Sequence, residues 1–283
     1  MFGLIALASA LLAAPAPPPS PADSNQIVVE GVRQRDKAIH DFVTSVTPAP
    51  IGGGQLRRYQ TAVCPAAVGL PEEQNRRVAA RLADVARAVG IPLAPAGCGP
   101  NALVVVVDNK DEFVAGLRQQ YPDYFYDAVY GRKDPPREQG PAIAWHVEGL
   151  LTADHIPAAK DPVWHYYMVS STDSSRLRPQ AIPHFMSGVV VIERRALAGL
   201  SVTQLADYAA MRLYATTDPT HLRAGASSIL GVLDAPVGTP IPITLTSWDL
   251  SFLRSLYTTD DRQFANRQRN EIERAVSRDD HRN

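Results

Sequence analysis

The first part of the chain alternates between β-branched runs and segments with helical spacing of apolar residues. The run from Ile27 to Val32 predicts a short strand, and the segment from Asp36 to Val46 predicts an amphipathic helix. Prolines and glycines between Pro48 and Gly54 then indicate a turn or linker. The apolar face of the predicted helix consists of Ile39, Phe42, Val43 and Val46.

A helix, a strand and a second helix are predicted next. Pro71 suits the start of a helix, and Gly90 suits its end. The valine-rich run from Ala102 to Val107 is typical of a strand covered on both faces. Asp108 or Asn109 can cap the helix after it. Apolar residues at helical spacing are Val78, Leu82, Val85 and Val89 in the first helix, and Phe113, Val114 and Leu117 in the second.

The pattern changes between Gly131 and Gly188, where prolines are frequent and helix formers are few. Two runs with strand character, Ala142 to Val147 and Val163 to Val169, predict a β-rich and loop-rich insertion over 131–188. A strand from Val189 to Glu193 then brings the chain back to the core.

The C-terminal third is predicted to be helical. Ser201 and Gln204 have the spacing of a capping box, and Thr246 and Asp249 form a looser version. A last helix is predicted from Asp260 to about Val276. Strands that alternate with helices predict an α/β fold, with α+β as the alternative. We expect a central sheet with packed helices, the β-rich insertion in the middle, and a helical C-terminal third.

Residues 1–23 have the pattern of an export signal. Residues 1–16 form an apolar run that is shorter than the roughly 20 residues of a membrane span, and prolines follow it. Since no Lys or Arg precedes the run, an uncleaved anchor or a misplaced start remains an alternative. We expect a signal peptide and Pro-rich leader over 1–23, one α/β domain over 24–276, and a disordered tail over 277–283. The protein would then be periplasmic or secreted, with no integral membrane span after processing.

The two cysteines agree with export. An even number of cysteines in an exported chain predicts a disulfide, here between Cys64 and Cys98. Closing a loop of about 34 residues would stabilise the fold by about 3–4 kcal/mol. Two separate buried thiols are the alternative. Neither cysteine has a second Cys or a His at the spacing of zinc ligands.

Composition and motifs narrow the functional classes. The net charge of −1, without a basic run, argues against a nucleic-acid partner. The sequence contains no nucleophile elbow, no phosphate-binding glycine loop and no dinucleotide fingerprint. No two of the seven histidines are four residues apart, so neither a metal nor another cofactor is predicted.

His146, His165 and Tyr208 are the candidate pocket residues. His146 and His165 each follow a tryptophan in a strand-like run, so they would face one side if these strands were neighbours. The alternative is a pair of half-buried histidines with purely structural hydrogen bonds. No catalytic residue is assigned beyond these three candidates.

Several motifs carry a family resemblance. They are Cys64-Pro65-x-x-Val68-Gly69-Leu70, Cys98-x-Pro100-Asn101, Leu205-Ala206-Asp207-Tyr208, and Leu245-Thr246-x-Trp248-Asp249-x-x-Phe252-Leu253-Arg254-x-Leu256-Tyr257. With these motifs the chain resembles exported alphaproteobacterial proteins of unknown function, over most of its predicted mature length. That family has no assigned activity, so the resemblance implies export alone.

The order of elements is also similar to that of exported zincin-like putative metallopeptidases. In those proteins an apolar strand leads to a helix with His-Glu-x-x-His, then to a Ser-Ile stretch and a Leu-Thr-x-x-Asp helix start. Here the order is Val189 to Glu193, a helix from Val202, Ser228-Ile229, and Leu245-Thr246-x-x-Asp249. At the metal motif this chain has Asp207-Tyr208-Ala209-Ala210-Met211, without either histidine or the glutamate. The resemblance therefore implies a zincin-like scaffold without zinc chemistry.

Two functional hypotheses remain. The first is a non-catalytic exported protein that binds an envelope component or a protein partner, because the fold is well specified and no catalytic set is assembled in the sequence. The second is a periplasmic hydrolase, such as an atypical zincin-like peptidase, whose residues meet only in the fold. Converging histidines and a carboxylate would favour the hydrolase, and an apolar groove would favour binding.

Overall fold

The computed structural model describes residues 24–48, 54–127, 131–132, 134, 137–161, 167–169, 179–222, 227–236 and 238–282. The chain divides into two units, residues 1–35 and 36–283. The described part of the first unit, residues 24–35, is helical and belongs to α1. The other described elements belong to the second unit.

The described residues form α-helices, β-strands and short 3-10 helices, joined by loops and turns. The α-helices are α1 (Ser24–Val46), α2 (Glu72–Val89), α3 (Lys110–Gln120), α4 (Val202–Tyr214), α5 (Ser247–Thr258) and α6 (Ala265–Asp280). The strands are β1 (Pro65–Val68), β2 (Ala102–Val107), β3 (Tyr126–Asp127), β4 (Gly131–Arg132), β5 (Ala142–Thr152), β6 (Ala159–Lys160), β7 (Tyr167–Met168) and β8 (Ala181–Glu193). Short 3-10 helices are η2 (Pro122–Phe125), η3 (Arg194–Leu197), η4 (Pro219–His221) and η5 (Ile229–Gly231).

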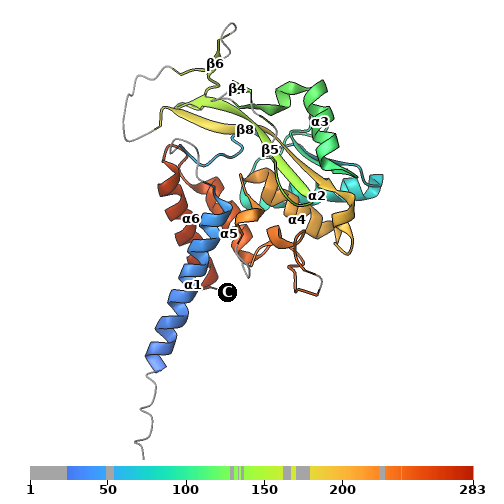
Figure 1. Cartoon of the computed structure of the whole chain (residues 1–283). Helices are drawn as coiled ribbons and strands as arrows, with labels where there is room; N and C mark the ends of the chain where they lie inside the picture. Colours follow the sequence, from blue (N-terminus) through green and yellow to red (C-terminus); the bar gives the residue numbers. More distant parts are fainter. Residues whose placement is uncertain are drawn as a thin grey trace, which may run out of the picture. The chain divides into compact units, whose positions relative to one another are not determined.

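Four strands form a mixed sheet in the order β1-β2-β8-β5 (Figure 1). β2 is parallel to both β1 and β8, whereas β5 is antiparallel to β8 and places Ile143 opposite Val191. The register of β5 and β8 shifts at a bulge between Val147 and Glu148. A sheet with helices packed on it is the α/β fold that the sequence predicts.

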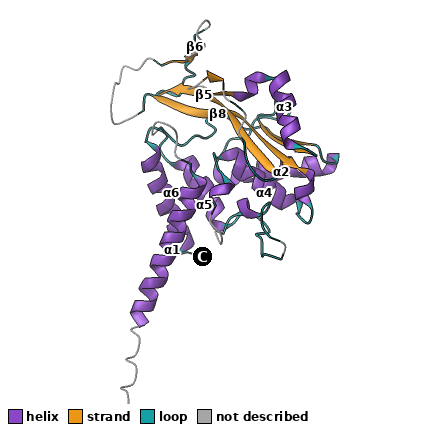
Figure 2. Ribbon diagram, viewed as in Figure 1, coloured by secondary structure: helices purple, strands orange, loops and turns teal. Residues whose placement is uncertain are grey.

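Helices cover both faces of this sheet (Figure 2). Side chains alternate along each strand, so Val104 and Val190 pack in the larger core with α2, α4 and α5. Val105 and Val191 face the opposite way and pack with Val114 of α3. The continuous valine run of β2 is thus explained by burial on both faces, as predicted.

Several predicted helix ends are confirmed. α2 starts directly after Pro71 and ends at Gly90, which has the left-handed conformation that glycine tolerates. Asn109, and not Asp108, caps α3 by accepting hydrogen bonds from two backbone N–H groups of the first turn. Ser201 and Thr246 each begin a complete capping box, at the starts of α4 and α5.

The strand predicted from Ile27 to Val32 is wrong, because these residues lie within α1. A helix satisfies its backbone hydrogen bonds within one segment, whereas a strand needs a partner strand. The run is continuous with the predicted helix from Asp36, and no strand pairs with it among the described residues. The helix prediction from Asp36 to Val46 is confirmed, with its four apolar residues buried.

The last helix lies later in the chain than predicted. α6 runs from Ala265 to Asp280 instead of from Asp260 to Val276, so it includes the start of the predicted disordered tail. Its last turn is held to α5 by side chains, because Trp248 Nε1 donates to Asp280 and Ser251 Oγ donates to Asp279. Residues 163–166 of the predicted strand Val163 to Val169 lie outside the described residues, and Tyr167–Met168 forms β7.

Cys64 and Cys98 form the predicted disulfide, with an S–S distance of 1.99 Å. The bond joins the residue before β1 to the turn before β2, so it fixes the start of both parallel strands. None of the described helices has the length and hydrophobicity needed to cross a membrane.

Candidate functional site

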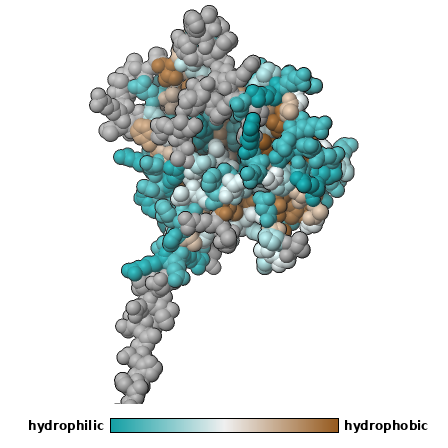
Figure 3. All heavy atoms as spheres, viewed as in Figure 1, coloured by the Kyte–Doolittle hydropathy of each residue, from teal (hydrophilic) through white to brown (hydrophobic). Residues whose placement is uncertain are grey.

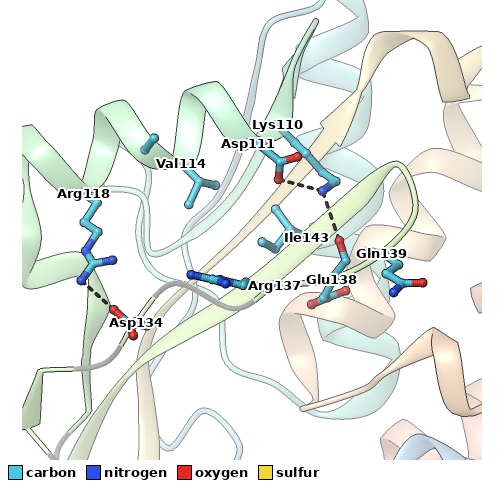
Figure 4. A pocket seen from close by; sticks show the side chains of 10 residues that line it. Lys110, Asp111, Val114, Arg118, Asp134, Arg137, Glu138, Gln139 and Ile143 are labelled. Carbon is cyan, nitrogen blue, oxygen red and sulfur yellow. Dashed lines mark hydrogen bonds and ion pairs between the residues drawn. The ribbon is translucent and has the colours of Figure 1, made fainter.

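The candidate site is a cavity of about 630 Å³ between α3 and the segment that leads into β5 (Figure 4). On the face shown in Figure 3, the described residues are mostly hydrophilic and the hydrophobic ones form small separate patches. The cavity lining combines charged side chains with the apolar side chains of Val114, Ala115 and Ile143. The cavity is lined by Lys110, Asp111, Val114, Ala115, Arg118, Asp134, Arg137, Glu138, Gln139 and Ile143.

Lys110 forms one end of the cavity. It is the first residue of α3, and the Asn109 cap fixes the turn that carries it directly after β2. The lysine side chain is buried, and its Nζ donates to Asp111 Oδ1 at 2.9 Å and to the Glu138 carbonyl oxygen at 3.1 Å. Because an ammonium group has three donors, one donor of Lys110 is left after these two bonds.

Arg118 and Arg137 supply the other two positive charges. Arg118 pairs with Asp134 at 2.6 Å on the exposed side of the cavity. In Figure 4 the Arg137 side chain lies between this pair and the contact of Lys110 with Glu138. Among the described residues, Arg137 has no hydrogen bond or ion pair to balance its charge.

The Glu138 carboxylate is already bound by groups of α4 and β5. Arg212 Nη2 of α4 lies 2.5 and 2.6 Å from its two oxygens, and the Ala144 N–H of β5 donates to it at 3.2 Å. These contacts anchor residues 137–139 along β5 and thereby position Arg137. Nε and Nη1 of the buried Arg212 have no hydrogen-bond partner among the described residues.

Tyr208 lies one helical turn before Arg212 and is fully enclosed by the core. Burial raises the pKa of Tyr208 to about 12, with Arg212 acting in the opposite direction. The phenol is therefore neutral near neutral pH, and it is poorly suited to act as a base.

The structure places the candidate His146 in a structural role. Its Nε2 lies 2.9 Å from the carbonyl oxygen of Leu213 at the end of α4, and its ring stacks on Phe185 with centroids 3.7 Å apart. His165 lies outside the described residues. His146 and Tyr208 thus contact different groups, and the structure does not show the three candidates forming one site.

The residues at the place of the zincin-like metal motif are also buried in α4. The Asp207 carboxylate is bound by Arg81, by the Thr244 hydroxyl and by the Leu245 N–H. Across the described parts of the chain, no three His, Cys, Asp or Glu side chains are grouped so that they could hold a metal ion.

Sequence reasoning missed Lys110, Arg137, Glu138 and Arg212. One signal was available, because Lys110 follows the C-terminal end of a buried parallel strand, where open sheets bind ligands. Arg137 and Glu138 carry no such signal, since they lie in a segment that the sequence assigns to loops. Comparisons of the chain with protein-family models, curated proteins and solved structures gave no match.

Proposed function

We propose that this protein is an exported, non-catalytic binding protein that holds an envelope component or a protein partner in the cavity lined by α3, by Asp134 and by residues 137–139. The observation that carries this proposal is Arg137, a cation without a charge partner that faces a hollow with an apolar floor. A charged side chain that lines a cavity and has no partner of opposite charge in its own chain is suited to bind a ligand of opposite charge.

Two features support export. The leader pattern of residues 1–23 is that of a signal peptide, and disulfides such as Cys64–Cys98 persist mainly in oxidising compartments. A hydrolase remains the alternative, but no observation on the described residues favours it. Of the residues that the sequence offers for it, His146 is bound to a backbone carbonyl, Tyr208 is buried in the core, and His165 lies outside the described residues.

The proposal is tested by introducing a photo-crosslinking amino acid at Gln139, which lines the cavity. In the cell that produces the protein, irradiation should give a defined adduct in the envelope fraction. The same amino acid at Asp84, exposed on α2, is the matched control and should give none. Adding Arg137→Glu to the Gln139 variant should abolish the adduct.

Two results would contradict the proposal. One is the same pattern of adducts from Gln139 and from Asp84, since the cavity would then have no specific ligand. The other is a full-length, unprocessed protein found by mass spectrometry in the cytosol, which would remove the basis for export.

A further inference from the structure

We infer that the group bound in this cavity is a single carboxylate carried on an apolar body. This inference rests on the proposed binding function and names the chemical class of its ligand. It comes from the balance of charges around Arg137, from the geometry of the available donors and from the apolar floor of the cavity.

The charges that line the cavity cancel in pairs, except for one. Lys110 forms an ion pair with Asp111, and Arg118 forms one with Asp134. The Glu138 carboxylate is bound by Arg212 of α4, which is not among the residues that line the cavity. Arg137 lines the same cavity and has no ion-pair partner among the described residues. A ligand with one negative charge completes this balance.

A second negative charge on the ligand would be unfavourable. Asp111 and Asp134 line the same cavity, so a dianion would approach two carboxylates with only one unpaired cation to neutralise it. This argues against phosphate monoesters and dicarboxylates. It favours a monoanion whose charge lies at Arg137.

The available donors fit a carboxylate. The guanidinium of Arg137 is planar and can donate two parallel hydrogen bonds to the two oxygens of a carboxylate. Lys110, which also lines the cavity, has one donor left for a ligand that reaches its ammonium group. The carboxamide of Gln139 also lines the cavity.

The cavity also has an apolar surface that the apolar part of the ligand can contact. Val114 and Ala115 on α3 and Ile143 on β5 line the cavity between the charged ends. Val114 and Ile143 belong to the buried cluster on this face of the sheet, so they form a fixed floor. The volume of about 630 Å³ lies within the range of about 300–1,000 Å³ that is usual for small-molecule sites.

Two sources can supply such a group: the C-terminus of a protein that ends in an apolar residue, or a free acid with a short alkyl chain. Binding is measured by calorimetry on the purified full chain, with hexanoate and hexanamide as one pair of probes. The second pair is an acetylated tripeptide ending in leucine, with a free or an amidated C-terminus. We expect at least one acid to bind about tenfold or more tightly than its amide, because the amide lacks the charge.

Variants connect this binding to the cavity. Arg137→Gln should abolish the preference for acid over amide, and Arg137→Lys should keep part of it because the charge remains without the planar pair of donors. Arg278→Gln removes an exposed arginine from α6 and should leave binding unchanged. Thermal unfolding of all three variants checks that they are folded.

The outcomes separate the possibilities. Binding of the peptide acid alone supports a protein C-terminus as the source, and binding of hexanoate alone supports a free acid. Equal binding of acid and amide, no binding of either acid at millimolar concentration, or an unchanged preference in Arg137→Gln overturns the inference. In those cases an Arg137-dependent adduct at Gln139 would still support the proposed function.

Discussion

Arg81 of α2 binds the fully buried carboxylate of Asp207 in α4 through two hydrogen bonds, from Nε at 2.7 Å and from Nη2 at 3.1 Å. The Thr244 hydroxyl donates to the same carboxylate at 2.6 Å, and the Leu245 N–H donates at 2.9 Å. One side chain thus connects two helices to the segment that precedes α5. At a position where the zincin-like resemblance would place a metal ligand, this residue has a structural role.

Replacing Asp207 should destabilise the protein strongly. We expect Asp207→Ala to lower the free energy of unfolding by about 2–4 kcal/mol, since the buried Leu245 N–H loses its acceptor while the partly exposed Arg81 can turn towards solvent. Asp84→Ala removes the exposed pair with Arg87 and should cost less than about 1 kcal/mol. Urea unfolding of both variants measures the difference, and equal losses would contradict the role of Asp207.

Gly69 should tolerate no side chain. It has a φ of +93°, and a Cβ built on it would lie 2.0 Å from the Val106 carbonyl oxygen of β2. Gly69→Ala should therefore cost about 3 kcal/mol or more, through backbone strain and displacement of a central strand. Gly199 has a φ of +82° but nothing within 4 Å, so Gly199→Ala should cost only about 1 kcal/mol. Similar melting temperatures for the two variants would show that the close approach to β2 is unimportant.

His184 should make stability depend on pH. Burial lowers its pKa, and its Nδ1 has no hydrogen-bond partner among the described residues. Below the unfolded value of about 6.5, the unfolded chain therefore binds a proton that the folded protein does not bind. The stabilising contribution is complete above about pH 6.5 and is lost as the pH falls towards the folded pKa.

The test compares the wild type with His184→Gln, whose side chain does not titrate. Between about pH 7 and pH 5, the urea midpoint of the wild type should fall more steeply than that of the variant. Parallel curves for the two proteins would contradict a lowered pKa at this position.

The disulfide should contribute measurably to stability. Cys64 and Cys98 are separated by 34 positions, and in the chain-entropy model opening such a loop costs about 3–4 kcal/mol. A Cys64→Ser, Cys98→Ser double variant should melt at a lower temperature than the oxidised protein. Dithiothreitol should lower the melting temperature of the wild type and leave that of the double variant unchanged. Two free thiols in protein purified without reductant, measured by mass spectrometry, would contradict the prediction.

Local structure was the part of the fold that the sequence predicted best. The caps at Ser201 and Thr246 and the apolar spacing of α2 depend on neighbours within one or two turns. β8 was predicted only from Val189, because Pro183 and His184 are not typical of a central strand. β2 pairs with β8 only from Gly188 onwards, so the missing N–H of Pro183 interrupts no ladder with β2.

The candidate site was beyond prediction for a similar reason. Arg137, Glu138 and Arg212 come from a loop and from a distant helix, and only the antiparallel pairing of β5 with β8 brings them together. His146 was proposed as a pocket residue, with a half-buried structural histidine as the alternative, and in the fold it is a half-buried residue of β5. Its acceptor, however, is a backbone carbonyl of α4, which no side-chain pattern reveals.

The place of β8 between β2 and β5 has a consequence for biosynthesis. Both neighbours precede β8 in the chain, so each emerges from the ribosome or a translocation channel before the strand that will join them. Until residue 193 has emerged, the backbone N–H and C=O groups of β2 and β5 that pair with β8 have no partner strand. Such unpaired strand edges promote pairing between molecules. The four-stranded sheet therefore cannot be completed until β8, the last of its strands in the chain, has been released.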